Sequence, residues 1–529
     1  MSLDPIAALR VTRVQWRGTA ILSYPDAPST IIDVLDRAVQ RHGDRPFLVA
    51  PEGTLTYAEF AELVSDAATS LNDLGVACGD RFAVAAVNGL DIAVAIFAAA
   101  HVGAIMVGLN TKLAPDQWAF MLTHSQVTLA LAQPEFANRL SDAAAGSGLP
   151  TDRLRDLSTV MRGGRQAGPP ARRAPSDSAR TYAVVYTSGT TGRPKASQVV
   201  HRCSVHSAMS YAHLLGLGPQ DRTAVVFQLF YISAMHAHLL PMALVGGSCV
   251  LVPDASPTSY LELLSSHQIT WAYTVPSMWL LLLRDPSFDA ARLPHLRLAA
   301  FGGSPFPVTE IVELRRRLPS TRWHDVYGLS ETHSPATMLL DHEFTAKPGS
   351  VGRPLPCMEA MVVDENGGQL PADAAGELWL RGSLVTTGYA DDPLATAAAI
   401  TEGWFHTGDI ARIDDEGYVY IVDRKKDMIS RGGHKIFSAE VEQVLRLDPR
   451  VLDAAVVGAP DPVAFEAVVG FVVARRGARP TKKDLRHLVR DHLADYAVPR
   501  HIHFVDELPR NATGKLEKDK LRALAAGGK

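Results

Sequence analysis

The sequence YTSGTTGRPK at Tyr186–Lys195 decides how the rest of the chain is interpreted. The preceding residues Tyr182–Val185 are β-branched and aromatic, which predicts a buried strand. Glycines such as Gly189 and Gly192 let the backbone approach a ligand closely, and N–H groups and hydroxyls can then donate to phosphate oxygens. The stretch therefore predicts a phosphate-binding loop, to which we assign Thr187, Ser188, Gly189, Thr190, Thr191, Gly192 and Lys195.

Two other interpretations of this stretch are weaker. It is not the Walker phosphate loop, because the pattern G-x-x-x-x-G-K-[ST] does not occur in it. A flexible surface loop rich in Ser, Thr and Gly is the simpler alternative. The strand before the loop and the lysine that follows Pro194 favour phosphate binding.

Composition predicts a soluble globular protein with several domains. With 529 residues the chain is too long for one core, and its length suggests about two to four domains. Apolar residues make up 47% and charged residues 20%, as in ordinary globular proteins. The formal net charge of −4 gives no reason to expect nucleic acid or an acidic membrane surface as a partner.

Cysteine usage and the N-terminus predict a cytoplasmic protein. The start MSLDPIAALR has an early Asp4 and no apolar core, so we expect no secretory signal. The apolar stretch 82–109 is interrupted by polar residues and predicts strand, turn and helix rather than a membrane span. The chain has no CxxC spacing, and we expect four reduced, buried thiols: Cys78, Cys203, Cys249 and Cys357.

Alternating strands and helices predict an α/β fold with largely parallel sheets. In the first part, helical periodicity covers residues 30–48, and 56–75 begins with Thr56 and Glu59, the pattern of a capping box. The proline- and glycine-rich segment 163–179 is expected to be a mobile surface linker. The alternation itself is predicted as strands 82–87, 104–108, 223–229, 248–252, 270–274 and 296–301 with helices 92–101, 234–244, 258–267, 276–283 and 308–318.

After about residue 350 the pattern changes to short strands and turns, which predicts a small β-rich subdomain. The charge run Asp423–Asp427 is our predicted boundary between a large domain, 1–423, and a small α+β domain, 424–529. The predicted elements are strands 360–363, 376–381, 417–422, 452–457, 467–473 and 501–505 with helices 438–447 and 482–493.

Two further motifs follow predicted strands. The sequence FGGSP at Phe301–Pro305 reads by itself as a tight turn before a helix. In YGLSE at Tyr327–Glu331, an aromatic ring can stack on a base, the Ser330 hydroxyl can reach a phosphate, and a carboxylate can hold Mg²⁺. A core tyrosine and a satisfied loop glutamate are the alternatives for this motif.

Taken together, these motifs resemble those of the adenylate-forming enzymes, which include acyl-CoA ligases, adenylation domains of peptide synthetases and luciferases. The motifs are closest to the acyl-CoA ligases and span most of the chain, although the usual YGxTE is YGLSE here. The resemblance implies ATP, Mg²⁺ and CoA as ligands, with Glu331 on the metal and Ser330 among the catalytic groups. It also implies a nucleotide site that includes Gly302, Gly303, Ser304, Asp325, Tyr327 and Gly328.

The resemblance extends to the C-terminal part of the chain. It assigns Asp409, in WFHTGD, and Arg424 to the ribose. Lys426 falls on the family's hinge between the domains. In the segment SRGGHK, Gly432 and Gly433 would line a narrow tunnel for a thiol. Lys515, in PRNATGK, would neutralise charge between the acyl carboxylate and the α-phosphate, although such a Thr-Gly-Lys tail is usually a surface turn.

The predicted acid pocket departs from that of amino-acid-activating relatives. In the family that the chain resembles, adenylation domains for α-amino acids have Asp at the position of Tyr231 and CoA ligases often have His there, whereas no carboxylate occurs here between Asp221 and Asp254. A substrate ammonium would be left unpaired, at a cost of several kcal/mol. We therefore expect an apolar or aromatic acid, although ordinary core packing explains each pocket residue equally well. The predicted pocket comprises Tyr231, Ala234, Met235, His236, Tyr273, Leu329 and His333.

The sequence thus predicts an AMP-forming acid–thiol ligase that adenylates a carboxylic acid and passes the acyl group to CoA. One alternative keeps the adenylation and transfers an acid, even an unusual one such as nitrite, to a carrier protein or an amine. Another is an AMP-binding sensor without turnover, which the joint presence of Glu331, Asp409, Arg424 and Lys515 opposes. The identity of the acid and the oligomeric state stay open.

Overall fold

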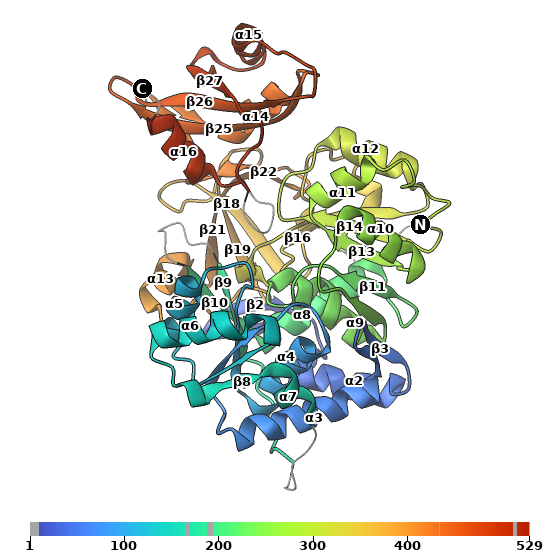
Figure 1. Ribbon diagram of the computed structural model, residues 1–529. Helices are drawn as coiled ribbons and strands as arrows, with labels where there is room; N and C mark the ends of the chain where they lie inside the picture. The colour runs from blue at the N-terminus through green and yellow to red at the C-terminus, as the bar shows by residue number, and fades with distance from the viewer. Residues whose placement is uncertain (1–9, 164–169, 188–193, 433, 511–515, 528–529) are drawn as a thin grey trace. The chain divides into compact units, whose positions relative to one another are not determined.

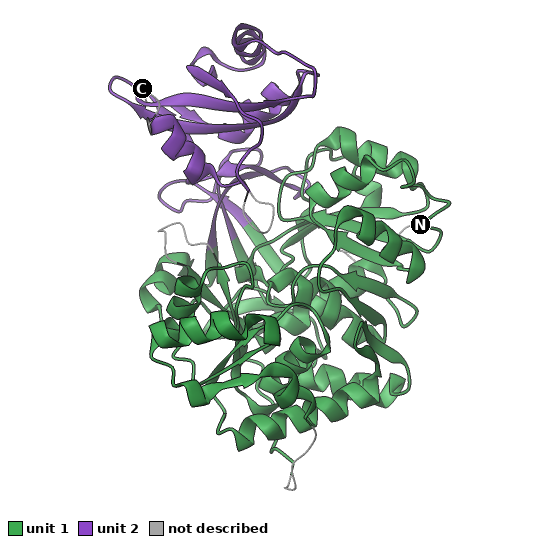
Figure 2. Ribbon diagram, in the orientation of Figure 1, with its two compact units in different colours: residues 1–360, 380–405 green, residues 361–379, 406–529 purple. Residues whose placement is uncertain are grey.

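The computed structural model describes residues 10–163, 170–187, 194–432, 434–510 and 516–527 (Figure 1). The chain divides into two compact units, coloured in Figure 2. The larger unit contains Met1–Ala360 and Leu380–Phe405, and the smaller contains Met361–Trp379 and His406–Lys529. The sequence pattern is predicted to change after about residue 350. In the structure, the chain passes between the two units more than once after this point.

The larger unit has a six-stranded sheet that carries the hairpin of the predicted phosphate loop. All neighbouring strands pair in parallel except β10 and β9, which are antiparallel. The sheet order is β10 (Lys195–Val200), β9 (Thr181–Thr187), β6 (Ile105–Gly108), β5 (Arg81–Ala85), β7 (Leu129–Ala132) and β8 (Leu154–Asp156). The helices of this part are α4 (Leu90–Val102), α5 (Pro115–His124), α6 (Ala137–Ser147) and α7 (Leu157–Arg162).

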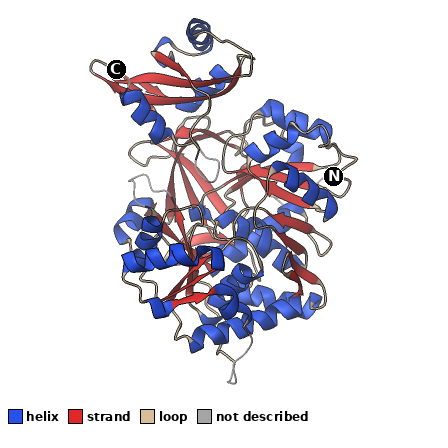
Figure 3. Ribbon diagram, viewed as in Figure 1, coloured by secondary structure: helices blue, strands red, loops and turns tan. Residues whose placement is uncertain are grey.

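A nine-stranded sheet forms the rest of this unit's core and ends beside the predicted nucleotide motifs. Its order is β17 (Arg353–Pro354), β16 (Thr337–Leu339), β15 (Arg322–Tyr327), β14 (Leu298–Gly302), β13 (Trp271–Thr274), β11 (Arg222–Val225), β12 (Ser248–Leu251), β3 (Pro46–Ala50) and β4 (Gly53–Thr56). The associated helices are α2 (Ile31–His42), α3 (Tyr57–Asp73), α8 (His201–Leu215), α9 (Leu240–Val245), α10 (Pro257–Ser266), α11 (Pro276–Leu283) and α12 (Val308–Arg317). The alternation of helices and strands is visible in Figure 3.

Large aromatic side chains fill the space between this sheet and helices α10–α12. Trp279 and Trp323 are fully buried and meet edge to face, with ring centroids 4.9 Å apart. Such pairs add about 0.5–1.5 kcal/mol beyond their buried area. This packing fixes β14 and β15, whose C-terminal ends carry the two nucleotide motifs.

A third, five-stranded sheet follows residue 357, and the division between the units falls within its strands. Its strands are β18 (Met358–Val363), β19 (Gly376–Gly382), β21 (Trp404–Ile413), β20 (Ile400–Thr401) and β22 (Val419–Arg424). Beyond it, the smaller unit has a second five-stranded sheet: β24 (His434–Ile436), β23 (Ile429–Arg431), β26 (Phe465–Ala474), β25 (Val451–Asp461) and β27 (His501–Phe504). Its helices are α14 (Ser438–Arg446), α15 (Lys482–His492) and α16 (Lys518–Gly527).

The predicted α/β class is confirmed, with a large mixed α/β part and a small α+β part. The capping box at Thr56 is also confirmed, because its side chain accepts from the Glu59 N–H and the Glu59 carboxylate accepts from the Thr56 N–H. The helix predicted over 30–48 is too long. It ends at His42, and Pro46 begins strand β3 because proline cannot donate the hydrogen bond that a helix interior requires. The division at residues 423 and 424, with a hinge near Lys426, stays a prediction.

In the segment 163–179, predicted to be a mobile surface linker, the structure describes residues 163 and 170–179. Although this part has no helix or strand, Arg173 forms ion pairs with Asp33, at 2.5 Å, and Asp36 of helix α2. The backbone N–H of Ala174 donates to the His101 carbonyl. Proline and small residues here mark an irregular segment that specific contacts hold in place.

The prediction of four buried thiols holds for Cys203, Cys249 and Cys357 but is wrong for Cys78, which is exposed. All four cysteines are free thiols. Among the described residues, no helix combines the length and apolar character needed to cross a lipid bilayer.

A buried ion pair attaches the C-terminal helix to the core of the smaller unit. Lys518 Nζ lies 2.7 Å from Glu442 Oε1 and donates to Ser438 Oγ at 2.7 Å. The side chains of Lys518 and Glu442 are only 12% and 9% exposed. Glu442 also accepts from the Val456 N–H, so its charge is matched by well-placed donors.

We expect Lys518→Met to destabilise the smaller unit, because Glu442 would keep its charge inside the protein without its nearest cation. Removing one partner of a buried pair costs about 3–5 kcal/mol, and we expect the lower end because the Val456 N–H and the Arg446 guanidinium, 3.7 Å from Glu442, remain. Lys520→Met is the matched control, since Lys520 pairs with Glu517 at 64% exposure and such pairs contribute below about 1 kcal/mol. Urea unfolding of the full chain measures both, and equal effects of the two substitutions would contradict the assignment.

Candidate functional site

The predicted phosphate loop connects the two strands of the β9–β10 hairpin. Thr187 and Lys195 face each other in register at the end of this hairpin where the two strands are connected. Ser188, Gly189, Thr190, Thr191 and Gly192 lie outside the described residues. The strand predicted before the loop is confirmed, and the strand that follows it, β10, was not predicted.

The segment Thr386–Ala390 joins this hairpin to the predicted metal-binding residue. The Gln198 N–H of β10 donates to the Gly388 carbonyl at 3.1 Å, and the Ala390 N–H donates to the Ala196 carbonyl at 2.8 Å. At its other end, the Thr386 N–H donates to the Glu331 carbonyl at 2.7 Å. Backbone hydrogen bonds therefore fix the position of the YGLSE motif relative to strand β10.

Tyr389, at the centre of this segment, contacts both charged groups of the predicted site. Its hydroxyl donates to Glu331 Oε1 at 3.0 Å. The ammonium of Lys195 lies over its ring, 4.9 Å from the centroid. Tyr389 and Glu331 are each 8% exposed. Burial first, and then the neighbouring Glu331 carboxylate, hold the pKa of Tyr389 well above its usual range, so the phenol keeps its proton and acts as a donor.

The YGLSE motif folds back sharply on the end of strand β15. A Cβ on Gly328 would lie 1.4 Å from the Ser334 carbonyl oxygen, so only glycine fits at this position. Ser330 and Glu331 begin a single 3-10 turn, Ser330–Thr332. His333 and Ser334 follow it with φ values of 53° and 84°. Left-handed backbone at two consecutive non-glycine residues is costly and is typical of a functional loop held by its surroundings.

The FGGSP motif lies beside YGLSE because the strands that precede the two motifs are parallel neighbours. In this pairing Phe301 lies opposite Asp325 and Gly302 opposite Val326. A Cβ on Gly302 would meet the Val326 carbonyl at 2.3 Å and the Tyr273 hydroxyl at 2.8 Å, which requires glycine. Gly303 has a φ of 82°, and both Gly303 and Ser304 are exposed at the strand end. The structure therefore brings the predicted nucleotide residues of two strands to one edge of the sheet.

Asp325 lies on strand β15, opposite Phe301 of the FGGSP motif and two residues before Tyr327 of the YGLSE motif. Burial raises its pKa to about 8, and the Val326 N–H acts in the opposite direction. Tyr273 lies close enough that the Asp325 charge raises the pKa of its phenol, after burial. At neutral pH the Asp325 carboxyl is therefore mainly protonated and can donate a hydrogen bond.

The predicted acid pocket contains two kinds of residue. Tyr231 is half-buried, and its hydroxyl accepts from the amide of Asn110 at 2.9 Å. Ala234, Met235 and His236 instead lie in a buried π-helical turn, Ala234–Leu239. Such turns are rare and frequently occur at functional sites.

The two predicted pocket histidines are core residues with partners at both ring nitrogens. His236 contacts the Ile232 carbonyl and Ser204 Oγ, at 2.8 and 2.9 Å. His333 accepts from the Val200 N–H and contacts the Leu384 carbonyl, both at 3.0 Å. Both rings are fully buried, and burial lowers the pKa of each. Neither ring therefore has a nitrogen left over for a bound acid.

The structure brings together the two predicted ribose residues of the smaller unit. Asp409 and Arg424 are opposite each other in the β21–β22 pairing, and their side chains lie 3.4 Å apart. The Asp409 carboxylate is 6% exposed and the Arg424 guanidinium 48%. The WFHTGD sequence lies within strand β21.

The hinge and tunnel residues also belong to the smaller unit. The Lys426 carbonyl accepts from Arg522 of helix α16 at 3.1 Å. Gly432 has a φ of 57°, and its N–H donates to the Ala464 carbonyl at 2.9 Å. Gly433 and Lys515 lie outside the described residues.

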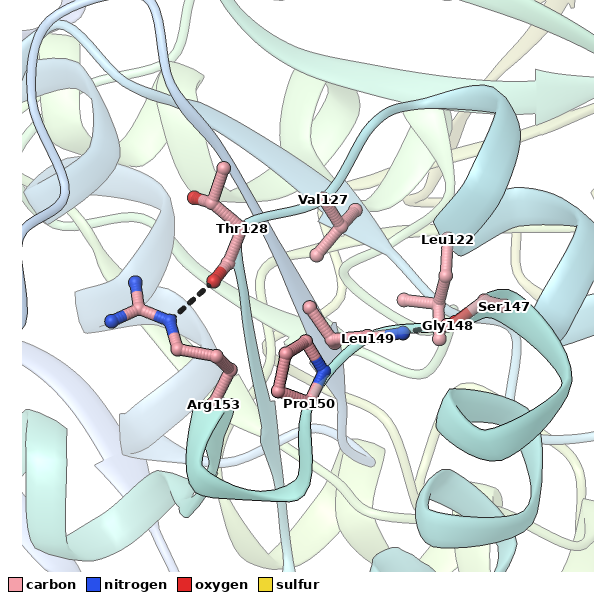
Figure 4. Close-up of a pocket in the computed structure, with 8 residues that line it drawn as sticks. All are labelled: Leu122, Val127, Thr128, Ser147, Gly148, Leu149, Pro150 and Arg153. Atoms are coloured by element: carbon pink, nitrogen blue, oxygen red, sulfur yellow. Dashed lines mark hydrogen bonds between the residues drawn. The ribbon is translucent and has the colours of Figure 1, made fainter.

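A surface hollow in the larger unit contains none of the predicted site residues (Figure 4). It has a volume of about 350 Å³ and lies between helices α5 and α6. Its wall is apolar around Leu122 and Val127, and Arg153 donates to the Thr128 carbonyl at its edge. We assign it no ligand.

Sequence reasoning missed two residues that contact the predicted site, Tyr389 and Asn110. Asn110 belongs to the segment Gly108–Leu113, which carries no recognisable chemistry by itself. In the sequence TTGY at Thr386–Tyr389, the glycine is the one feature that could have indicated a constrained backbone beside Tyr389. Gly388 has a φ of 127°, and an added Cβ would lie 2.4 Å from the Thr396 side chain.

Comparisons with known proteins agree across nearly the whole chain. Residues 35–390 match the AMP-binding enzyme family, and residues 440–515 match the AMP-binding enzyme C-terminal domain. An indoleacetate–CoA ligase from Aromatoleum aromaticum is 31% identical, over 90% of this chain and 94% of its own.

Two solved structures have the same fold and differ in the reaction that their names state. The o-succinylbenzoate coenzyme A synthetase of Bacillus subtilis, in complex with ATP and magnesium ion, is 29% identical with a TM-score of 0.81, covering 93% of this chain and 98% of its own. An amide bond synthetase from Marinactinospora thermotolerans is also 29% identical, with a TM-score of 0.84 and coverage of 93% and 99%.

The raised pKa of Asp325 predicts a pH-dependent effect of Asp325→Asn. Because the folded pKa of about 8 lies above the ordinary value of 3.8, the folded chain binds an extra proton between these values and loses stability as the pH rises through this window. The variant lacks this loss, so its free energy of unfolding should gain about 1–3 kcal/mol on the wild type between about pH 5 and pH 8.

Urea unfolding at several pH values measures this gain, with Glu262→Gln as the control for removing an exposed carboxylate of the same unit. A difference between Asp325→Asn and the wild type that does not change with pH would show that Asp325 is ionised throughout.

Proposed function

The chain belongs to the AMP-binding enzyme family, and from this membership we infer that it is an AMP-forming acyl-CoA synthetase. The enzyme adenylates a carboxylic acid with ATP, releases pyrophosphate and transfers the acyl group to CoA. One observation supports this function most strongly. Within one unit, Lys195 of the phosphate hairpin and the Glu331 carboxylate are held on the two sides of a single side chain, Tyr389.

In the proposed first step, the substrate carboxylate attacks the α-phosphate of ATP and pyrophosphate leaves. Thr187–Lys195 would hold the phosphates, and the edge formed by Gly302–Ser304 and Asp325–Gly328 would hold the adenine. Asp409 and Arg424 would bind the ribose hydroxyls. These groups act by positioning the reactants and stabilising charge, which supply most of the catalysis in phosphoryl-group chemistry.

Glu331 fits a magnesium site. Mg²⁺ in nucleotide enzymes is commonly held by one or two carboxylates together with substrate phosphates, and Glu331 presents a carboxylate beside the phosphate hairpin. When bound, Mg²⁺ neutralises phosphate charge and favours loss of pyrophosphate. The Ser330 hydroxyl would contact a phosphate oxygen on the same turn.

The second step is proposed to use a different arrangement of the C-terminal domain, residues 424–529. Lys515 would neutralise the charges that meet during adenylation and would then withdraw as this domain rotates about Lys426. Gly432 and Gly433 would line the path of the CoA thiol to the acyl adenylate. A small domain that moves on a hinge allows two chemically different steps to share one pocket.

The substrate is proposed to be an apolar or aromatic acid. In the predicted pocket, the Tyr231 hydroxyl pairs with Asn110, and the rings of His236 and His333 have protein partners. An α-ammonium would have no carboxylate partner on the segment between Asp221 and Asp254. The relatives named for indoleacetate and o-succinylbenzoate act on aromatic acids, which supports the same class here.

A second acceptor is worth testing because one structural neighbour is an amide bond synthetase. Purified enzyme, ATP and a panel of arylacetic, cinnamic and benzoic acids would be incubated with CoA, with a pantetheine-bearing carrier protein and with simple amines. We expect thioester formation with CoA. Adenylate that accumulates with CoA and is consumed only by the carrier or an amine would overturn the acceptor assignment.

The cytoplasmic compartment is also part of the proposal. Four free thiols and the absence of disulfides support it, since exposed Cys78 would be prone to oxidation elsewhere.

Lys515→Ala should separate the two half-reactions. Loss of the ammonium removes charge neutralisation from adenylation alone, so acid-dependent exchange of pyrophosphate into ATP should fall by roughly 100-fold or more. Conversion of a supplied acyl adenylate and CoA to thioester should stay within about threefold of the wild type. Lys520→Ala is a matched control for removing a nearby lysine. Equal loss in both half-reactions would show that Lys515 does not act in the first step.

A further inference from the structure

Asn110 holds the hydroxyl of Tyr231 in one orientation. The Lys112 N–H donates to Asn110 Oδ1 at 3.0 Å, so the Asn110 amide nitrogen is the atom that donates to the Tyr231 hydroxyl, at 2.9 Å. A phenol oxygen that accepts from an amide still has its own proton to donate. Within the described ranges no side chain or carbonyl accepts this proton. Burial raises the pKa of Tyr231, although the Asn110 hydrogen bond acts in the opposite direction, so the phenol keeps its proton at neutral pH.

Tyr231 lies beside the edge of the six-stranded sheet from which the phosphate hairpin extends. Strand β6 ends at Gly108, two residues before Asn110, and pairs in parallel with β9, which ends at Thr187. A Cβ on Gly108 would lie 2.5 Å from Phe230 Cβ, so glycine lets the segment that carries Tyr231 pack directly against the end of β6. Parallel neighbours present their carboxyl ends at one edge, which is where α/β sheets bind ligands. The free proton of Tyr231 is therefore placed near the edge at which β9 leads into the phosphate hairpin.

The predicted acid pocket offers few other groups to a carboxylate. No Lys or Arg occurs between Arg222 and Arg284, the stretch that contains most of the pocket. The two pocket histidines have protein partners at every ring nitrogen. The hydroxyl of the other pocket tyrosine, Tyr273, lies against Gly302, where an added Cβ would be 2.8 Å from it. A carboxylate taken out of water needs a hydrogen-bond donor, and Tyr231 is the pocket side chain placed to supply one.

Resting on the proposed function of this site, we propose that Tyr231 is a further catalytic residue and that Asn110 is its positioning residue. The Tyr231 hydroxyl donates to the carboxylate oxygen of the acid that does not attack the α-phosphate. This oxygen becomes the carbonyl oxygen of the acyl adenylate. It gains negative charge when the CoA thiolate adds to the carbonyl carbon, and it loses that charge as the C=O bond reforms and AMP leaves. One donor therefore orients the acid in the first half-reaction and stabilises the oxyanion in the second.

Two substitutions remove this hydrogen bond in different ways. Tyr231→Phe keeps the ring and removes the hydroxyl. Asn110→Asp keeps an acceptor for the Lys112 N–H, but its carboxylate should accept the Tyr231 proton and so withdraw it from the acid. Tyr57→Phe is the matched control, because Tyr57 is a buried tyrosine whose hydroxyl donates to two backbone carbonyls of the same unit, and it belongs to no part of the predicted site.

A pair of acyl-adenylate analogues reports on the hydrogen bond itself. They are made from the arylacetic, cinnamic or benzoic acid that gives the fastest exchange of pyrophosphate into ATP. The β-ketophosphonate analogue keeps the acyl carbonyl, the matching alkylphosphonate has CH₂ in its place, and both carry one negative charge. In calorimetric titration the full-length wild type should prefer the carbonyl analogue by about tenfold, and Tyr231→Phe and Asn110→Asp should each lower this preference below about threefold. Tyr57→Phe should keep the wild-type preference, even where it lowers the melting temperature.

Kinetic measurements separate this role from a general loss of structure. For Tyr231→Phe we expect kcat/KM for the acid in pyrophosphate exchange to fall about 30-fold. The KM for ATP should stay within about twofold, because the nucleotide residues are unchanged. Thioester formation from a supplied acyl adenylate and CoA should fall about 100-fold, since an oxyanion would lose its donor.

The outcomes distinguish this proposal from the proposed function. An unchanged preference for the carbonyl analogue in Tyr231→Phe, or an equal loss of it in Tyr57→Phe, would overturn the role of Tyr231. A preference lost in Tyr231→Phe but kept in Asn110→Asp would overturn the positioning role of Asn110. A wild-type protein that exchanges pyrophosphate with no acid would refute the proposed function itself.

Discussion

The backbone pairing between strand β10 and the segment Thr386–Ala390 is the constraint on which the predicted site depends. It ties strand β10, one strand of the phosphate hairpin, to the YGLSE motif, because the same segment donates from the Thr386 N–H to the Glu331 carbonyl. Without it, the two sheets of the larger unit would present their loops independently. A site that binds a triphosphate and its metal needs both loops at once, since placement of fixed charges is the main contribution that a protein makes to this chemistry.

Burial of polar groups beneath the site has a related effect. His236 and His333 use all four ring nitrogens on protein partners, and Ser204 links His236 to Tyr182 of strand β9. Buried polar groups are stabilising only when they are satisfied, and such networks allow one arrangement of the chain rather than several. The network therefore holds strand β9, the π-helical turn and the strained turn at His333 in one relative position.

Sequence reasoning predicted the parts of this protein that local chemistry determines. The strands, the capping box at Thr56 and the glycines of FGGSP and YGLSE were readable because each depends on neighbours within a few residues. Tyr389 was not readable, since its two partners lie far from it in the sequence. For the same reason the sequence cannot show that both ring nitrogens of His236 and of His333 are engaged by protein partners.

The central claim is that the acid is activated as an adenylate before any acceptor reacts. The most direct measurement uses substrate acid labelled with oxygen-18 in its carboxyl group, followed by mass spectrometry of the nucleotide released after thioester formation. Attack of the carboxylate on the α-phosphate leaves one labelled oxygen in AMP, and the account predicts this result. Label in the phosphate or pyrophosphate, or unlabelled AMP, would contradict it.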